Sequence, residues 1–599
     1  MTKYNKYLII IIVILVVALI GVSYSAFTTR ITGAEEGTTL SSGSGTVEIN
    51  FDGGPAINVP DIYPREEEFL TKEFTLNGTN SYNTKMDYHL LLVMNTNTFR
   101  DGALAYTLTS VNDDSNGETA HDIEYLNGIK TGEREVFLGN GFFEGISNAS
   151  HTYTLKMYLP RIENFDHTVD QNKEFSAKIE IREGNIYPGY NKEKGVNYPV
   201  LFTGMTPVVW DGEEFIPTTS DDPDWYDYDE KRWANARTQD GSYWVWIPRY
   251  AYKITSGYHS SETGTIDVKF LQGTTNLAYD ETTAETTSYE PGVKDTAMHY
   301  FTHPVFDDEA LGFWVAKYEA TAHEVLSSGT TSDSCSSLDN VSDKSPKIVP
   351  NAISWRCINN SNAYKASLSM KDNPIYGWHS SEVDTHMMTN LEWGAVTYLS
   401  KSKYGAHTNE VWNNSFMGFQ TGCSGSGASA SSESTCITYE TPNGQKASTT
   451  HSIYGVYDMS GGAWERVMGN YNGFIGSSGF GAEELLQMHP KHITRYYTAT
   501  EDLLDGYGVD YDLTIYGDAV HETSYNAYRY SPTAPTGTAS GAWNSDYSHL
   551  PDVSSYPWFA RGGNWSNGSN GGTFAFNISS GNALWFSSFR PAVSVPSVP

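Results

Sequence analysis

Residues from about 45 to 182 alternate between apolar and polar side chains, and this pattern limits the possible folds more than any other feature. In the run 175–181 (FSAKIEI), apolar residues occupy every second position. Successive side chains of a β-strand point to opposite faces, so this run is expected to be an antiparallel strand with one buried face. Further runs of this kind, separated by turn residues, predict a β-sandwich; they lie at 47–51, 88–93 and 153–159.

The first residues have the composition of an export signal. Lys3 and Lys6 precede an uncharged, mostly aliphatic run at 7–22, and small residues follow at 23–26. A cleaved leader and a retained membrane anchor both stay open, because the apolar run extended to Phe27 can almost span a bilayer. In either case we expect the rest of the chain on the extracellular side of the cell membrane, at the cell surface, or secreted if the leader is cleaved.

Composition argues against nucleic-acid binding and against helical bundles. Charged residues make up 18% and aromatic residues 14% of the chain, a balance that favours short strands and long loops. The formal net charge of −33 repels phosphate backbones, so no nucleic-acid partner is expected. With 599 residues the chain is too long for one hydrophobic core, and we expect at least two domains.

Four cysteines fit an oxidising compartment, where an even number is usually paired; they are Cys335, Cys357, Cys423 and Cys436. Cys423 and Cys436 bracket a Ser- and Gly-rich loop with nothing apolar to hold it, so this pairing is favoured and leaves Cys335 with Cys357. Closing such a loop stabilises a fold by roughly 3 kcal/mol in the chain-entropy model. A zinc site is the alternative, although no Cys-x-x-Cys pair or nearby His-x-x-x-His is present.

The N-terminal third carries an apolar leader that ends in Tyr24-Ser-Ala-Phe27, a following strand at 47–51, and strands at 153–159 and 175–181. These features resemble the camelysin and biofilm fibre-subunit family of Gram-positive bacteria. The resemblance implies a jelly-roll-like sandwich over 28–183, after the signal or anchor segment 1–27, and a role in surface display or assembly. The turn-rich, non-periodic segment 184–200 is expected to be a linker.

Four segments of the C-terminal half follow one another in a distinctive order: 312–321 (GFWVAKYEAT), 388–399 (MTNLEWGAVTYL), 455–465 (GVYDMSGGAWE), and 561–565 (RGGNW) with 588–592 (SFRPA). Together they resemble the formylglycine-generating enzyme, or sulfatase-modifying factor, family. The resemblance implies an α+β domain of C-type-lectin-like fold over 305–599. Residues 201–304, with many tryptophans, are expected to form a β-rich first part of the same head.

The motif residues are expected to be structural. The segment 388–399 predicts an amphipathic helix capped by Asn390. Arg561 suits a planar contact to a buried carboxylate, with Glu465 and Glu392 as candidates. Tight turns are expected at the glycines of 455–465, around aromatic core residues. Structural roles are assigned to Arg561, Gly562, Gly563, Trp464, Glu465 and Arg590.

The oxidase chemistry of the resembling family is expected to be absent. That family binds copper through two cysteines just after its RGGSW motif, because copper(I) requires thiolate ligands. In this chain residues 561–599 contain no cysteine, and Gly462 replaces the asparagine of the family's calcium-binding turn, although Glu465 remains. We therefore expect no enzymatic activity, no catalytic residue, no metal ligand and no cofactor, with calcium left open.

The segment 558–592 is rich in Asn, Ser, Gly and aromatic residues. It closely resembles the variable C-terminal segment of retroelement-diversified proteins, in which a lectin-like fold holds positions that vary to create a binding surface. Aromatic side chains supply contact area at low entropic cost, and small polar side chains supply hydrogen bonds. A core strand with a solvated loop is the alternative. The residues expected to bind ligand are Trp558, Asn564, Trp565, Ser566, Ser569, Thr573, Ala575, Ile578, Ser579, Leu584, Trp585 and Phe586.

These features predict an exported adhesin or receptor-like protein that binds a protein or glycan ligand on another cell, a phage or a host surface. A divergent metal-dependent enzyme of the formylglycine-generating superfamily is one alternative, and it requires a cluster of histidine and carboxylate in the head. A structural fibre subunit is the other. His386, His451 and His489 lie near the motifs, but without the spacing of metal ligands.

Overall fold

A computed structural model describes the strands at 38–40, 47–52 and 57–59 and the chain over 64–596, except for 81–84, 101, 115, 118–123, 127–134, 146, 162–169, 171, 281–284, 291–296, 298, 307–309, 329–334, 497–515, 529–536 and 552. The expected signal or anchor segment 1–27 lies outside the described residues. Within the described part, none of the helices has both the length and the apolar character needed to cross a membrane. The chain divides into two compact units, Met1–Pro188 and Gly189–Pro599.

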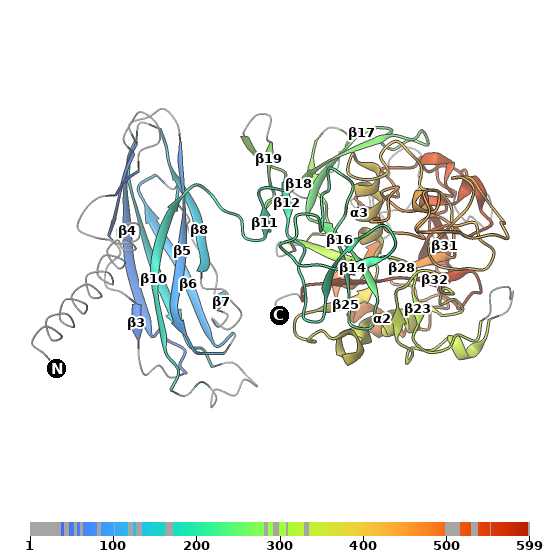
Figure 1. Cartoon of the computed structure of the whole chain (residues 1–599), viewed down its shortest axis with the longest axis horizontal. Coiled ribbons are helices and arrows are strands. Elements are labelled where there is room, and N and C mark those ends of the chain that lie inside the picture. Colours follow the sequence, from blue (N-terminus) through green and yellow to red (C-terminus); the bar gives the residue numbers. More distant parts are fainter. Residues whose placement is uncertain are drawn as a thin grey trace, which may run out of the picture. The chain divides into compact units, whose positions relative to one another are not determined.

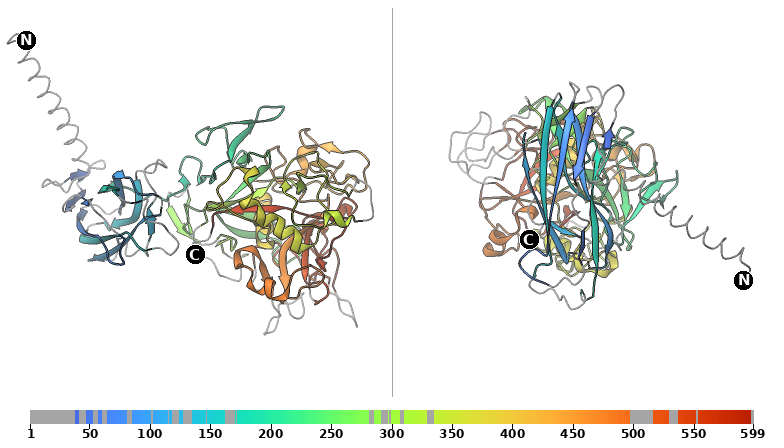
Figure 2. Two further views of the ribbon diagram at one scale, coloured as in Figure 1. Left: turned by 90° about the horizontal axis from the view of Figure 1, so that it is seen from below. Right: turned by 90° about the vertical axis from the view of Figure 1, so that its left-hand side faces the viewer.

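Unit 1 is built from two antiparallel sheets (Figure 1). A six-stranded sheet has the order β1-β2-β4-β9-β6-β7, and a four-stranded sheet has the order β3-β10-β5-β8. The long strands lie side by side, as the right-hand view of Figure 2 shows. The strands are β1 (Thr38–Leu40), β2 (Val47–Asp52), β3 (Ile57–Val59), β4 (Leu70–Asn80), β5 (Met86–Asn97), β6 (Leu104–Asn112), β7 (Glu124–Leu126), β8 (Glu135–Phe143), β9 (Ser147–Tyr158) and β10 (Phe175–Glu183).

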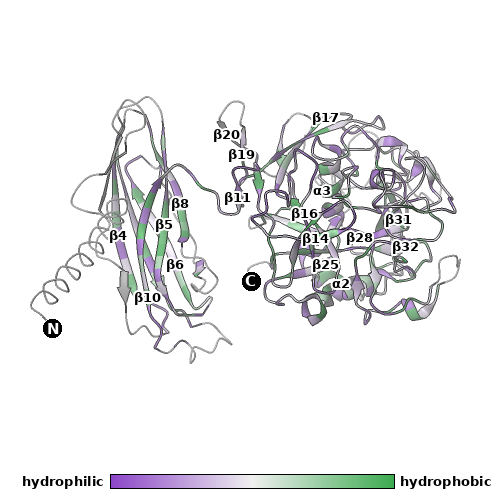
Figure 3. Ribbon diagram, in the orientation of Figure 1, coloured by the Kyte–Doolittle hydropathy of each residue, from purple (hydrophilic) through white to green (hydrophobic). Residues whose placement is uncertain are grey.

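The alternating pattern places one face of each sheet in a shared core. In β10, Phe175, Ala177 and Ile179 are buried, and they belong to the same apolar cluster as Tyr153 and Leu155 of β9 in the other sheet. Hydrophobic and hydrophilic residues accordingly mix along the strands in Figure 3. The all-β sandwich predicted from the sequence is confirmed. Strands β9 and β10 lie in different sheets, since β9 pairs with β4 and β6 while β10 pairs with β3 and β5.

Unit 2 combines short strands with long irregular segments, and all 15 tryptophans lie in it. Its described α-helices are α2 (Asn360–Ser369), α3 (Asn390–Lys401) and α4 (Ala482–Gln487), and short 3-10 helices lie between the other elements. The largest sheet has seven strands, and it unites the expected parts 201–304 and 305–599; its order is β14 (Phe215–Pro217), β13 (Thr206–Trp210), β15 (Asn235–Arg237), β16 (Tyr243–Pro248), β22 (Gly312–Ala316), β33 (Pro591–Ser594) and β25 (Asp384–Met387).

Smaller sheets complete unit 2. A five-stranded sheet contains β29 (Thr494–Tyr496), β28 (Trp464–Tyr471), β30 (Trp558–Gly562) and β31 (Gly572–Ser579), with β32 (Ser587–Phe589) paired to β28. A three-stranded sheet contains β18 (Thr265–Phe270), β17 (Tyr250–Ser256) and β21 (Phe301–Thr302). Two-stranded pairs are β19 (Leu277–Asp280) with β20 (Glu285–Ser288), β23 (Thr321–Ala322) with β24 (Pro346–Lys347), and β26 (Cys423–Ser424) with β27 (Ile437–Thr438).

Residues 189–200, expected as part of a linker, belong to unit 2 instead. They contain a hairpin of β11 (Tyr190–Asn191) and β12 (Val196–Asn197). Both residues of β12 are buried, and the Asn197 side chain donates hydrogen bonds to backbone carbonyl oxygens of Gly273 and Leu311, at 2.8 and 3.1 Å. These distant partners tie a turn-rich segment into the domain, which its composition does not reveal.

Helix α3 differs from the predicted helix in its cap and in its burial. The cap is Thr389 instead of Asn390: its hydroxyl accepts a hydrogen bond from the backbone N–H of Glu392, whose carboxylate accepts one from the backbone N–H of Thr389. Every residue of α3 except Leu391 is buried. The helix therefore has no solvated face and is not amphipathic in the expected sense.

Candidate functional site

Arg590 joins three of the motif segments. Its Nε donates to Oε2 of Glu465 at 2.6 Å, and its Nη2 donates to the other oxygen of the same carboxylate. It also donates to the backbone carbonyl oxygens of Ala316 and Tyr457, both at 2.9 Å. Burial raises the pKa of Glu465 to about 7, although the charge of Arg590 opposes that shift. Arg590 and Glu465 thus form an internal brace between motifs that are far apart in the sequence.

Arg561 has other partners than the sequence predicts. Its guanidinium donates at 3.1 Å to Oδ1 of Asn390 and to the backbone carbonyl oxygens of residues 518 and 519. The expected contact to Glu465 or Glu392 is therefore wrong, because both carboxylates are held by other groups: Arg590 for Glu465, and His386 with the α3 cap for Glu392. Arg561 still joins the fourth motif to the second through Asn390.

The turn at Gly462 packs against the carboxylate of Glu319. The resemblance had instead pointed to Glu465 as the acidic residue of a calcium-binding turn. Gly462 has a φ of +70°, and a Cβ on it would lie 2.7 Å from Oε1 of Glu319. That oxygen accepts a hydrogen bond from the backbone N–H of Ala463 at 2.8 Å. Glu465, the remaining acidic residue of the resembling motif, is occupied by Arg590 through both oxygens. Glu465 therefore has no oxygen left for calcium, whereas Oε2 of Glu319 has no hydrogen-bond partner among the described residues.

The residues expected to bind ligand fall into two groups. One group is buried, and for these the expectation of a surface contact is wrong, because both faces of β30 and most of β31 are covered; they are Trp558, Thr573, Ala575 and Ser579. Trp558, for example, stacks on Phe480 with 5.5 Å between ring centroids. The other group is at least partly exposed, and consists of Asn564, Trp565, Ser566, Ser569, Ile578, Leu584, Trp585 and Phe586.

Most of the exposed group lies on two loops, 564–571 and 580–586, which we call the C-terminal loop surface. Trp565 and Trp585 both pack edge-on against Phe419, with ring centroids 6.0 and 5.9 Å apart. Phe586 packs edge-on against Trp585 at 5.2 Å. Phe419 is buried, and the guanidinium carbon of Arg356 lies 3.9 Å from its ring centroid. The two half-exposed tryptophans therefore stand on a common buried aromatic floor.

The disulfide between Cys423 and Cys436, predicted from the sequence, is confirmed. It closes a loop whose Ser432 donates its backbone N–H to the carbonyl oxygen of Trp565 at 3.0 Å. The same loop packs near Gly568, where a Cβ would lie 3.5 Å from the carbonyl oxygen of residue 429. This crosslink therefore braces the first loop of the C-terminal loop surface.

The disulfide between Cys335 and Cys357 is confirmed as well. The backbone N–H of Cys357 donates to the carbonyl oxygen of Leu584 at 3.0 Å, and the neighbouring Arg356 donates to that of Trp585. Each loop of the C-terminal loop surface thus has a backbone carbonyl bound to a segment that a disulfide fixes.

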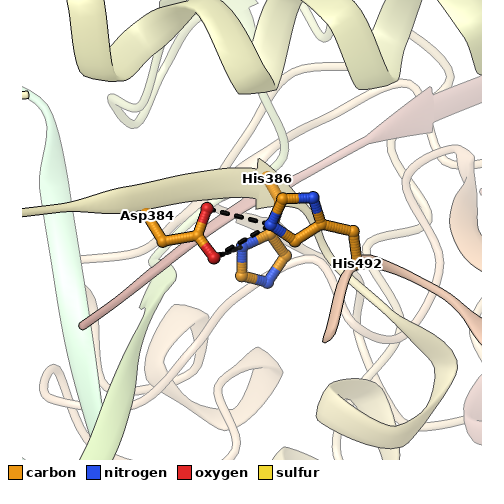
Figure 4. Close-up of side chains that lie close together, drawn as sticks. All are labelled: Asp384, His386 and His492. Carbon is orange, nitrogen blue, oxygen red and sulfur yellow. Dashed lines mark hydrogen bonds and ion pairs between the residues drawn. The ribbon is translucent and has the colours of Figure 1, made fainter. Parts of the chain in front are cut away.

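A cluster of histidine and carboxylate in unit 2 was missed by sequence reasoning. Strand β25 presents Asp384 and His386 on one face, since they are two residues apart. The turn at Pro490–His492 brings His492 to them, and its Nε2 lies 2.9 Å from both carboxylate oxygens of Asp384 (Figure 4). The Nδ1 of His386 lies 4.0 Å from Oδ2 of Asp384. Burial opposes ionisation of Asp384, but the hydrogen bond from His492 and the neighbouring histidine charges lower its pKa to about 2.

A cavity of about 290 Å³ lies beside this cluster, and its lining includes Phe306, Phe313, Leu391, Glu392 and His489. Glu392 connects the two, because its Oε1 lies 2.9 Å from Nε2 of His386. Asp384, His386 and His492 are not among the residues that line the cavity.

Comparison with known proteins assigns no family: no family model matches the sequence, and no curated protein matches it. The function proposed below therefore rests on the geometry of unit 2 and on the motif resemblances.

Proposed function

We propose that this protein is an exported surface protein that binds a protein or glycan ligand, without chemical turnover, through the C-terminal loop surface of a C-type-lectin-like head. The observation that carries the proposal is the pair of half-exposed tryptophans, Trp565 and Trp585, on the buried ring of Phe419. Rigid aromatic side chains among small polar ones are typical of adaptable binding sites. Bracing by two disulfide-fixed segments reduces the ordering that binding has to supply.

The division between exposed and buried positions supports diversification of this surface. Asn564, Ser566 and Ser569 are half-exposed or exposed, whereas Arg561 and Phe576 in the same segment are fully buried. Substitutions at the first set leave the core unchanged, while substitutions at the second set remove internal contacts. A segment that varies for binding requires such a division.

Sequencing the gene in independent isolates tests diversification. We expect substitutions at Asn564, Trp565, Ser566, Ser569 and Trp585, together with a nearby near-copy of the segment that differs at adenines. The matched control is the buried set of the same segment, Trp558, Arg561 and Phe576, which stays constant. Identical codons over 558–588 in all isolates, or substitutions spread equally over both sets, contradict diversification.

Binding itself is tested with the full chain on beads, offered to a glycan array and to a panel of bacterial cells. We expect Trp565→Ser and Trp585→Ser each to weaken binding by about tenfold or more, as for buried aromatic residues at interface centres. Tyr556→Ser is the matched control, because Tyr556 is 42% exposed and lies outside the surface. Wild-type beads that bind no array component and no cell, or two tryptophan variants that bind like the wild type, contradict the proposal.

Within this proposal unit 1 is a jelly-roll-like stalk that displays the head, and residues 1–27 direct export as a cleaved leader or a membrane anchor. The two-sheet architecture of unit 1 supports the stalk, since it matches what the fibre-subunit resemblance implies. Mass spectrometry of the protein recovered from cells distinguishes the two fates of the leader. A cytoplasmic location of the whole chain contradicts this part of the proposal.

A divergent metal-dependent enzyme is the second candidate, because Asp384, His386 and His492 supply the kind of cluster that such an enzyme requires. The position of the cluster favours a structural role. His386 is fully buried, and none of the three side chains lines the neighbouring cavity. Sustained conversion of a cysteine-bearing peptide by the purified protein would support the enzyme over the binding protein.

A further inference from the structure

We propose that Asp384, His386 and His492 hold one divalent transition-metal ion of the zinc class. The ligands are one carboxylate oxygen of Asp384, Nδ1 of His386 and Nε2 of His492, and these atoms lie within 4.8 Å of one another. In Figure 4 the carboxylate faces both imidazole rings. The proposal is independent of ligand binding at the C-terminal loop surface.

His386 supplies the strongest argument. Its side chain is fully buried, and its Nδ1 has no hydrogen-bond partner among the residues that the structure describes. Its other nitrogen, Nε2, lies 2.9 Å from Oε1 of Glu392, which can only accept a hydrogen bond when ionised. The neutral form of the ring therefore carries its proton on Nε2, and its Nδ1 then has a lone pair that no group in the described part of the chain binds. A buried polar atom without a partner is costly, and a metal ion satisfies it.

His492 is oriented in a matching way. Its Nδ1 lies 3.0 Å from the hydroxyl of Tyr364, while its Nε2 points at the carboxylate of Asp384. The rings of His386 and His492 stack with centroids 4.8 Å apart. Metal-binding histidines in proteins almost always have the second ring nitrogen hydrogen-bonded to a carboxylate, carbonyl, water or similar group. In both histidines of the cluster, the second ring nitrogen has such a partner: Glu392 for His386 and Tyr364 for His492.

Distances and donor types select the class of ion. Zinc binds imidazole nitrogen and carboxylate oxygen at about 2.0–2.2 Å, so two ligands of one ion lie about 3–4 Å apart. The separations of 2.9 and 4.0 Å from Asp384 bracket that range, and the full spread of 4.8 Å exceeds it, so the two imidazole nitrogens must move closer together when an ion binds. Two imidazoles and one carboxylate suit zinc or a similar transition ion, with water as a further ligand, whereas calcium prefers oxygen donors alone. With neutral imidazoles, a divalent ion also balances the two carboxylates of Asp384 and Glu392.

The ion would act as a structural crosslink. Asp384 and His386 belong to β25, at the edge of the seven-stranded sheet, and His492 comes 108 residues after Asp384. Metal binding would join that edge to the turn that precedes β29. Because the ligands come from separate parts of the chain, binding stabilises the folded state over the unfolded one.

Cobalt(II) is a direct probe, because its visible absorption reports coordination geometry. We expect the full chain, stripped with chelator and free of any affinity tag, to bind one equivalent of Co²⁺ with tetrahedral-type absorption that added Zn²⁺ removes. Asp384→Asn and His492→Ala should each weaken the apparent affinity by more than about tenfold. His489→Ala is the matched control, since its ring lies 5.7 Å from that of His492 but outside the ligand set.

A second readout covers variants that fold poorly. Zn²⁺ should raise the thermal unfolding midpoint of the wild type, followed by tryptophan fluorescence from unit 2, and should protect His492 from carbethoxylation. Asp384→Asn, which is nearly isosteric, should lose the zinc-dependent rise. Less than stoichiometric Co²⁺ binding by the wild type overturns the proposal, as does equal Co²⁺ affinity in the wild type, Asp384→Asn and His492→Ala.

Discussion

Arg590 donates to both carboxylate oxygens of Glu465, and neither side chain is exposed to solvent. Removing one partner leaves a buried, uncompensated charge, so Arg590→Met should lower the free energy of unfolding of unit 2 by about 3–5 kcal/mol. Urea unfolding followed by tryptophan fluorescence measures this unit alone, because all 15 tryptophans lie in it. Arg232→Met is the control, since its partner Asp224 is 81% exposed, and should cost under about 1 kcal/mol. Equal losses in both variants contradict the internal brace.

Restoring asparagine at position 462 should destabilise the protein without creating a calcium site. Gly462→Asn places a Cβ 2.7 Å from Oε1 of Glu319, and overpacking of this kind costs about 1–3 kcal/mol. Gly195→Asn is the matched control, because Gly195 has a similar φ of +64° but its Cβ would meet only one atom, at 4.0 Å. Calcium-dependent stabilisation of Gly462→Asn, measured by thermal unfolding, is the result that this explanation forbids.

The two disulfides should protect different loops. Replacing Cys423 and Cys436 with serine should cost about 3 kcal/mol and speed amide exchange in residues 564–570. Replacing Cys335 and Cys357 should instead speed exchange in residues 580–586, because Cys357 is bonded to Leu584. Each double variant is the control for the other in a hydrogen-exchange experiment. Faster exchange of both loops in either variant contradicts separate bracing.

His303 should make unit 2 less stable in acid. The side chain is fully buried, its Nε2 lies 2.7 Å from the carbonyl oxygen of Gly517, and burial lowers its pKa to about 3. The unfolded state therefore binds one more proton than the folded state at pH values between the folded and unfolded pKa. Stability is present above the unfolded pKa and is lost as pH falls.

Comparison with His303→Gln isolates this effect from other titrating groups. The wild-type advantage in unfolding free energy should shrink by about 2 kcal/mol from about pH 7 to about pH 5. His379→Gln, at an exposed histidine, should show no such change. A wild-type advantage that is constant across this range means that His303 is not held neutral by burial.

Features that depend on near neighbours in the sequence could be predicted. The alternation over 175–181 needs only the geometry of a strand, and the pairing of Cys423 with Cys436 needs only the loop between them. The burial of Trp558 and Ala575 comes from distant parts of the chain that cover both faces of β30 and most of β31, such as Phe480 against Trp558. The exposed and buried positions of the segment 558–592 can therefore be told apart from the structure but not from the sequence.

Contacts between residues far apart in the sequence could not be predicted either. The contact of Arg561 with Asn390 joins residues 171 positions apart, and two nearer carboxylates were equally plausible from charge alone. The cluster of Asp384, His386 and His492 left one signal in the sequence, since Asp384 and His386 share a strand face by their spacing. His492 is remote in sequence, so the third member of the cluster emerges only from the turn that packs against β25.

Backbone hydrogen bonds from Ser432 to Trp565 and from Cys357 to Leu584 join the two loops of the C-terminal loop surface to segments that disulfides hold. The order of both loops therefore depends on whether these disulfides are formed. In a reducing compartment the same chain would keep its tryptophans but lose the crosslinks that fix both loops. If the chain is exported and binds a ligand as proposed, its binding surface would be complete only where thiols are oxidised, and the surface would therefore mature at the same stage as export.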